Sequence, residues 1–200
     1  MKLILSSCDF LNEHSRKVIL DNLDKDLSDY KVLFIPNEKA TKDKINSDKY
    51  YLRLKDDGFN NRNNIYIFDE SRVDDFKDLD IELLYVSGGN TFATLDKLRK
   101  CGFDKEIVKY VNNGVIYIGG SCGAQIITSN IEHVEGFDDN YVNMTDYNGL
   151  NLFDGIIFCH YTEARRHNYE KALNGKYKVY KLTNNDSIVV NDNDIKVYYN

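Results

Sequence analysis

The sequence predicts a single α/β domain: a three-layer sandwich in which helices cover both faces of a mostly parallel central sheet. Two observations carry this prediction. Short apolar runs rich in β-branched and aromatic residues recur along the first 120 residues, and segments with helical spacing lie between them. Because the runs are apolar on both faces, they are typical of parallel strands buried between two layers of helices. The length of 200 residues fits one domain over 1–200.

The elements follow in order along the chain. The expected strands of the first part are Leu3–Leu5, Tyr30–Ile35, Asn64–Phe68, Glu82–Val86 and Val115–Ile118, each a short run of mainly apolar residues. The expected helices between them are Phe10–Leu23, Lys42–Arg53, Thr91–Lys100 and Lys105–Val111, where apolar residues recur at helical spacing.

After Thr128 the periodicity weakens. The stretch Asn130–Asn148 is rich in Asp and Asn and fits either a hairpin or a long loop. Beyond it we expect a strand at Gly155–Phe158, a helix at Arg166–Leu173, and short strands at Tyr177–Leu182, Ser187–Val190 and Ile195–Tyr199. The turn residues Asn-Asp-Asn-Asp between the last two strands favour a hairpin.

Composition and charge exclude several classes of protein. There are 26 basic and 32 acidic residues, and the net charge of −6 is opposite to the charge that neutralises phosphates, so we expect no nucleic-acid partner. No export signal and no apolar run of about 18 residues is present, which favours a soluble cytoplasmic protein without a membrane partner. The four cysteines form no CxxC pair and are read as reduced thiols. No metal-ligand motif is present, so we expect neither metal nor organic cofactor, in a monomer or homodimer.

Two of the expected strands end in glycine pairs, at the sheet edge where α/β proteins bind ligands. The first pair, Gly88 and Gly89, lies in Tyr85-Val-Ser-Gly-Gly-Asn-Thr91, where Asn90 or Thr91 can cap the following helix. This pair fits either a tight strand-to-helix turn or a close approach of backbone N–H groups to a ligand.

The second pair opens the motif Gly119-Gly-Ser-Cys-Gly123, which lies between a strand and a segment compatible with a helix. That context is the one a nucleophile elbow requires, because a sharp turn lifts the nucleophile and the helix N-terminus provides free N–H groups. Ser121 fits Gly-x-Ser-x-Gly without substitution. Reading Cys122 as the nucleophile of Gly-x-Cys-x-Gly needs Ala124 in place of the last glycine. Otherwise Cys122 is a small residue whose N–H contributes to the oxyanion hole.

A serine nucleophile needs a base, and the chain has four histidines. His160 follows the apolar run Gly155–Cys159 and therefore ends a strand, as Ser121 does. His14 lies in a polar helix and is expected to be solvated. His133 falls in the irregular stretch, and His167 is expected at the surface.

Taken together, these segments resemble the aspartyl dipeptidase (peptidase E) family of serine peptidases, which shares the flavodoxin-like core of class I glutamine amidotransferases. The matching segments are Met1–Ser7, Gly88–Phe92, Gly119–Ala124, Gly149–Leu152 and Cys159–Tyr161. The resemblance implies that Ser121 attacks a peptide carbonyl, that His160 takes the proton, and that N–H groups of Gly88, Gly89 and Cys122 hold the oxyanion. A glutamine amidotransferase would need His-x-Glu, and Glu163 comes one place too late.

The chain departs from the family in two places. The family carries an acidic third catalytic residue in a segment that corresponds to Leu182–Ser187, where the matching position is Asn184; Asp186 is the alternative. The family usually has alanine at the position of Cys122.

The family's preference for an N-terminal aspartate implies a cation near the site. Arg165 and Arg166 are candidates, although they also fit a basic first turn of a surface helix.

The resulting hypothesis is a serine exopeptidase that hydrolyses short peptides, with N-terminal Asp dipeptides as substrates, through an acyl-enzyme. The alternatives are a catalytically weakened binding or regulatory protein on the same scaffold, or an amidase that depends on Cys122.

Overall fold

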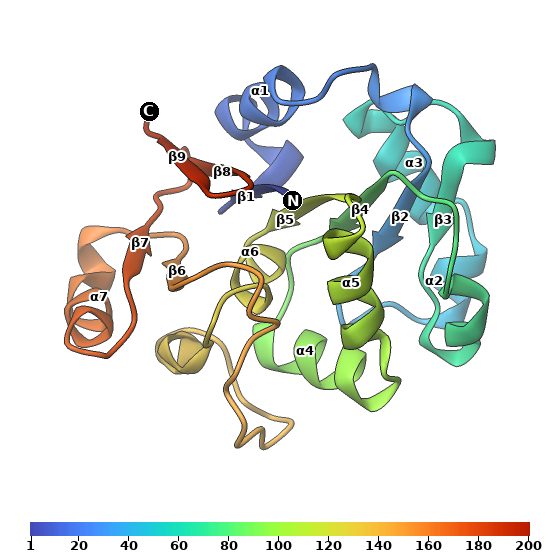
Figure 1. Ribbon diagram of the computed structural model, residues 1–200. Helices are drawn as coiled ribbons and strands as arrows, with labels where there is room; N and C mark the ends of the chain where they lie inside the picture. The colour runs from blue at the N-terminus through green and yellow to red at the C-terminus, as the bar shows by residue number, and fades with distance from the viewer.

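A seven-stranded sheet forms the centre of the computed structural model, which describes residues 1–200 (Figure 1). The strands are β1 (Lys2–Ser6), β2 (Val32–Ile35), β3 (Ile65–Ile67), β4 (Leu83–Val86), β5 (Ile116–Gly120), β8 (Ser187–Asn191) and β9 (Asp194–Tyr198). Their order is β3-β2-β4-β5-β1-β8-β9, and the first five are parallel. β8 runs antiparallel to β1 and forms a hairpin with β9. The mostly parallel sheet and the C-terminal hairpin are confirmed.

Helices cover both faces of this sheet, as the apolar strands predict. The helices are α1 (Glu13–Asp21), α2 (Lys42–Asn46), α3 (Lys49–Asp57), α4 (Thr91–Lys100), α5 (Phe103–Asn112), α6 (Cys122–Ile126) and α7 (Arg166–Leu173). Leu3 and Leu5 belong to a buried cluster that includes residues of α4, α5 and α6, whereas Ile4 belongs to a second cluster with residues of α1 and α3. Neighbouring residues of one strand therefore face opposite cores, which builds the three layers. None of the helices is long and apolar enough to span a membrane.

Two predicted helices have different bounds from those expected, because polar residues cap or interrupt them. The predicted helix Phe10–Leu23 begins only at Glu13, since the Asn12 side chain accepts hydrogen bonds from the N–H groups of His14 and Ser15 at 2.9 and 3.1 Å. A 3-10 turn, η1 (Asp9–Leu11), precedes it. The predicted helix Lys42–Arg53 is divided into α2 and α3 at Ser47, whose backbone is extended.

The remaining connections include short 3-10 turns. They are η2 (Leu27–Asp29), η3 (Arg62–Asn64), η4 (Glu70–Phe76), η5 (Glu132–Gly136) and η6 (Glu163–Arg165). The polar stretch Asn130–Asn148 is a long loop rather than a hairpin: it begins with η5, and an isolated bridge between Asn130 and Asn148 brings its ends together.

A second, two-stranded parallel sheet stands apart from the main one. It consists of β6 (Ile156–Phe158) and β7 (Val179–Lys181), with α7 between them in the chain (Figure 1). Both strands were expected from the sequence, whereas their separation from the main sheet was not. The backbone N–H of Leu182 donates to Phe158 O at 2.9 Å, so the residues that follow β6 and β7 stay side by side.

Candidate active site

Ser121 sits on a sharp turn between β5 and α6. Its backbone has φ 49° and ψ −110°, and residues other than glycine rarely adopt a positive φ. The N–H of Ser121 donates to Ser6 O at 2.8 Å, and α6 begins at the next residue. Strained backbone of this kind costs roughly 1–3 kcal/mol and is concentrated at functional sites. The turn has the geometry of a nucleophile elbow.

Close packing explains why glycines surround Ser121. A Cβ on Gly123 would overlap Val86 O, and a Cβ on Gly119 would lie 2.6 Å from Gly123 O. A Cβ on Gly120 would overlap the carboxylate of Asp9. The Gly-rich motif therefore lets α6 approach the ends of β4 and β5.

His160 meets Ser121 at the carboxyl edge of the sheet. Its Nε2 lies 2.8 Å from Ser121 Oγ, within the hydrogen-bond reach that two strand ends predict. His160 also has a positive φ, of 56°, and its backbone N–H donates to Ser7 Oγ at 3.0 Å, so the residue that follows β1 helps to hold it.

Asn184, not Asp186, lies behind the imidazole. The Nδ1 atom of His160 is 2.7 Å from Asn184 Oδ1. Because a carbonyl oxygen only accepts hydrogen bonds, Nδ1 carries the proton, and Nε2 is free to accept a hydrogen bond from the hydroxyl of Ser121. The carboxylate of Asp186 accepts the N–H groups of Thr183 at 2.7 Å and Asn200 at 3.2 Å, which fixes the loop around Asn184.

The backbone beside Ser121 offers free N–H groups. Those of Gly88 and Gly89 donate to no acceptor in the protein, and the N–H of Cys122, at the start of α6, has no acceptor within its helix. The Cβ position of Gly88 would be 3.4 Å from Ser121 Cβ, so this backbone lies against the serine side chain. A Cβ on Gly89 would overlap the carboxylate of Glu38. These groups can stabilise negative charge that develops next to Ser121.

The cysteines near the elbow are poor nucleophiles. Cys122 and Cys159 are fully buried, and burial raises the pKa of both thiols, that of Cys159 to about 12. Only a thiolate is an effective nucleophile. The Sγ atom of Cys122 lies 3.9 Å from Asn90 O, so its thiol packs against the start of α4.

The two arginines after His160 have different surroundings. Arg166 is exposed and forms an ion pair with Glu163 at 2.5 Å, as the surface reading of this segment predicts. Arg165 is partly buried, with its guanidinium 4.8 Å from the centre of the Phe137 ring and its Nη1 shielded from solvent without a partner. Arg165 and Arg166 therefore do not act together as one carboxylate-binding pair. Of the two, only Arg165 has an N–H donor that is shielded from solvent and has no partner.

Two carboxylates at the start of α4 were not predicted from the sequence. Glu38 Oε2 accepts the N–H of Asn90 at 3.0 Å, and Asp138 Oδ2 accepts the N–H of Thr91 at 2.7 Å. Glu38 follows β2 at the same sheet edge, which is a signal that could have identified it. Asp138 lies in the long loop, where no pattern marks it.

The other histidines lie outside this arrangement. His14 was expected to be solvated, but it is partly buried, and its Nε2 is shielded from solvent without a hydrogen-bond partner. His133 is also partly buried and contacts Ile157 O at 2.9 Å. His167 is exposed, as expected.

Known proteins are similar to this chain in sequence and in fold. The family model described as peptidase family S51 matches residues 3–198. An uncharacterized peptidase of Listeria monocytogenes serovar 1/2a is 32% identical over 120 residues, which cover 57% of this chain and 58% of that protein. Peptidase E of Escherichia coli O1:K1 is 36% identical over 83 residues, or 42% of this chain and 35% of the relative. Each of these matches spans less than two thirds of the relative's own length.

Solved structures match over almost the whole chain. A candidate peptidase E protein from Listeria monocytogenes EGD-e has a TM-score of 0.74 at 23% identity, covering 98% of this chain and 97% of that one. A peptidase from an acI-B1 Actinobacterium has a TM-score of 0.68 at 15% identity, covering 100% and 87%. At these identities the structures show the α/β fold alone. The family model, in contrast, spans nearly the full length, and the chain belongs to peptidase family S51.

Proposed function

We propose that this protein is a serine exopeptidase that hydrolyses short peptides through an acyl-enzyme on Ser121. The observation that carries the proposal is the continuous chain from Ser121 Oγ to His160 Nε2, at 2.8 Å, and from His160 Nδ1 to Asn184 Oδ1, at 2.7 Å. It lies on a strained elbow in a member of family S51.

The reaction begins with attack of Ser121 Oγ on the peptide carbonyl carbon. His160 Nε2 takes the hydroxyl proton, and the N–H groups of Gly88, Gly89 and Cys122 stabilise the oxyanion. When the C–N bond breaks, His160 returns the proton to the leaving amine. Water then attacks the ester carbonyl with His160 again as base, the bond between the acyl carbon and Ser121 Oγ breaks, and His160 returns the proton to Ser121 Oγ as the acyl group leaves as a carboxylic acid. Asn184 holds the imidazole in the required tautomer throughout.

Two unpaired carboxylates favour a substrate with a free N-terminus. Glu38 and Asp138 form no ion pair within the protein. Both lie near the elbow, because they accept the N–H groups of Asn90 and Thr91, and Asn90 O is 3.9 Å from the Sγ atom of Cys122. In our proposal they bind the α-ammonium of the substrate, which limits the acyl side to one residue. Such a limit supports an exopeptidase.

The side chain of that residue is proposed to be aspartate. The shielded and unpartnered Nη1 of Arg165 supports this choice, because a guanidinium binds a carboxylate strongly when water is excluded. Arg166, paired with Glu163 at the surface, is the weaker candidate.

A second function is favoured by one observation. Asn184 cannot stabilise the charged imidazolium as a carboxylate would, so the alternative is a catalytically weakened binding or regulatory protein on the same scaffold. The amidase that depends on Cys122 is disfavoured by the burial of that thiol.

The deciding experiment compares Asp-p-nitroanilide and Asp-X dipeptides with the N-acetylated anilide, for the wild type and Ser121→Ala. We expect the wild type to hydrolyse the free compounds, to be inactive on the acetylated one, and to lose activity in Ser121→Ala. Equal hydrolysis of the acetylated substrate would contradict recognition of the ammonium. No hydrolysis together with no fluorophosphonate labelling of Ser121 would favour the binding protein.

A further inference from the structure

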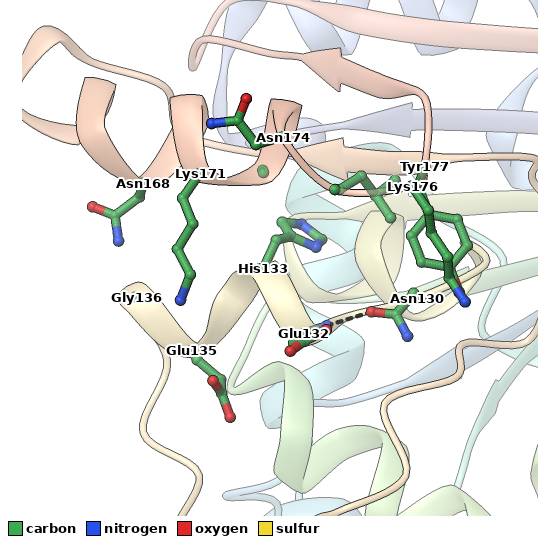
Figure 2. A pocket seen from close by; sticks show the side chains of 13 residues that line it. Asn130, Glu132, His133, Glu135, Gly136, Asn168, Lys171, Asn174, Lys176 and Tyr177 are labelled. Atoms are coloured by element: carbon green, nitrogen blue, oxygen red, sulfur yellow. Dashed lines mark hydrogen bonds between the residues drawn. The ribbon is translucent and has the colours of Figure 1, made fainter.

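A cavity of about 620 Å³ lies between η5 and the second half of α7, and it includes no residue of the candidate active site (Figure 2). Its volume falls in the range of small-molecule sites, about 300–1,000 Å³. Only three of its lining residues are hydrophobic, namely Ile156, Ala172 and Tyr177. A cavity of this composition suits a polar ligand.

The walls of the cavity are held close together by a glycine. A Cβ on Gly136, at the end of η5, would overlap the side-chain amide of Asn168 on α7. Glu132 is fixed at the opposite end of the turn, because its backbone N–H donates to Asn130 Oδ1 at 2.9 Å, the bond drawn in Figure 2. The local structure thus keeps the turn and the helix in contact around the opening.

Unpaired charges of both signs line the cavity. Lys171 extends from α7 toward the η5 turn, and Lys176 follows the helix (Figure 2). Glu132 and Glu135 belong to the turn itself. None of these four side chains forms an ion pair within the protein. A ligand with one ammonium and one carboxylate would satisfy both signs, whereas a singly charged ligand would leave one of them without a counter-charge.

His133 lies between the two walls and adds an unused acceptor. Its Nε2 donates to Ile157 O at 2.9 Å, so in the neutral ring Nδ1 carries a lone pair. This Nδ1 is shielded from solvent and has no partner in the protein. Burial lowers the pKa of His133 to about 4, so the ring stays neutral at pH 7 and adds no positive charge beside the glutamates.

We infer that this cavity is a binding site for a small zwitterion, a free α-amino acid or a dipeptide. The ligand's carboxylate lies toward Lys171, and its ammonium lies toward Glu132, beside the neutral ring of His133. The site is separate from Ser121, and the inference does not rest on the proposed peptidase reaction.

The test is isothermal titration calorimetry on the Ser121→Ala protein, which removes turnover of the ligand. The probes are L-alanine and L-alanyl-L-alanine, which differ in the distance between their charges, with acetate and methylamine as singly charged controls. We expect one zwitterion to bind at least about tenfold more tightly than either control, a difference of about 1.4 kcal/mol. The tighter of the two zwitterions identifies the class of ligand.

Variants locate the binding. Lys171→Met and Glu132→Gln should each weaken the tighter zwitterion by about tenfold or more, while Lys55→Met, an exposed lysine on α3, should leave its affinity unchanged. All three change exposed side chains, and equal thermal unfolding midpoints verify their folding. The inference is overturned if neither zwitterion binds up to about 10 mM, if a control binds as well, or if both cavity variants bind like Lys55→Met.

Discussion

His160 Nδ1 lies 2.7 Å from the side-chain carbonyl oxygen of Asn184, so an amide orients the imidazole. The resemblance to the peptidase E family implies an acidic residue at this position. The amide fixes the tautomer as well as a carboxylate does. It cannot, however, stabilise the positive charge that the ring acquires while it holds the serine proton. Orientation and charge stabilisation, which one carboxylate normally provides together, are separated in this protein.

Asn184→Asp is therefore expected to raise kcat by about tenfold or more while KM stays nearly constant, because the added attraction strengthens mainly in the transition state. Steady-state kinetics with Asp-p-nitroanilide measure both constants. Asn185→Asp is the matched control, since Asn185 accepts a hydrogen bond from Asn12 at 2.8 Å instead of facing His160. Equal rates for the two variants would contradict the role given to Asn184.

Asp186→Asn is expected to affect stability rather than chemistry. The carboxylate accepts two backbone N–H groups, from Thr183 and Asn200, and an amide can replace these bonds only in part. We expect the free energy of unfolding to fall by about 1–2 kcal/mol, with kcat per folded molecule retained. Urea denaturation and active-site titration separate the two quantities. If kcat collapses in a variant of unchanged stability, Asp186 takes part in the reaction.

Ser121 and Cys122 can be distinguished by labelling. Fluorophosphonate should modify Ser121 and abolish activity, whereas iodoacetamide should leave Cys122 unmodified, because its thiol is fully buried and its pKa is raised. The partly exposed Cys8 and Cys101 are internal controls that should react faster in the same peptide map. Cys122→Ala should keep most of the activity. Retained activity in Ser121→Ala, with loss in Cys122→Ala, would reverse the assignment.

The sequence predicts those parts of the site that lie at strand ends. Ser121 and His160 each follow an apolar run, which predicts that both end strands, where α/β proteins place their sites. Their proximity also depends on tertiary packing, because β5 and β6 belong to different sheets. The role of Asn184 could be predicted only from the resemblance. The turn after β7 has no repeating pattern of apolar residues that would indicate which side chain points at the imidazole. The contacts that place it, such as the bond between Asn185 and Asn12, join residues 173 positions apart.

The same reasoning explains what the sequence missed. Thr91–Lys100 and Arg166–Leu173 have the bounds predicted. The separate sheet of β6 and β7 depends on which strands pair, and apolar runs alone do not specify a partner. Asp138 lies in a loop without periodicity, and only tertiary structure brings it to the N–H of Thr91.

The buried carboxyl group of Asp57 supports a prediction about pH. Asp57, at the end of α3, is buried, and its Oδ2 has no hydrogen-bond partner. Burial raises its pKa to about 6; the nearby Arg53 lowers it and the nearby Asp9 raises it. Arg53 is itself engaged elsewhere, since its Nη2 donates to the hydroxyl of Tyr85 at 3.1 Å.

A carboxyl group whose pKa is higher in the folded protein than in the unfolded chain favours folding when it is protonated. Its contribution to the free energy of unfolding is therefore fully present below about pH 4 and is lost as the pH rises through about 6. Asp57→Asn, which resembles the protonated group at every pH, should match the wild type near pH 4 and exceed its stability by roughly 1–3 kcal/mol near pH 7.5. Urea denaturation at several pH values measures this difference. Asp56→Asn, at an exposed position, is the control and should show no comparable gain as the pH rises. If the difference between Asp57→Asn and the wild type stays constant with pH, the carboxyl of Asp57 does not titrate in this range.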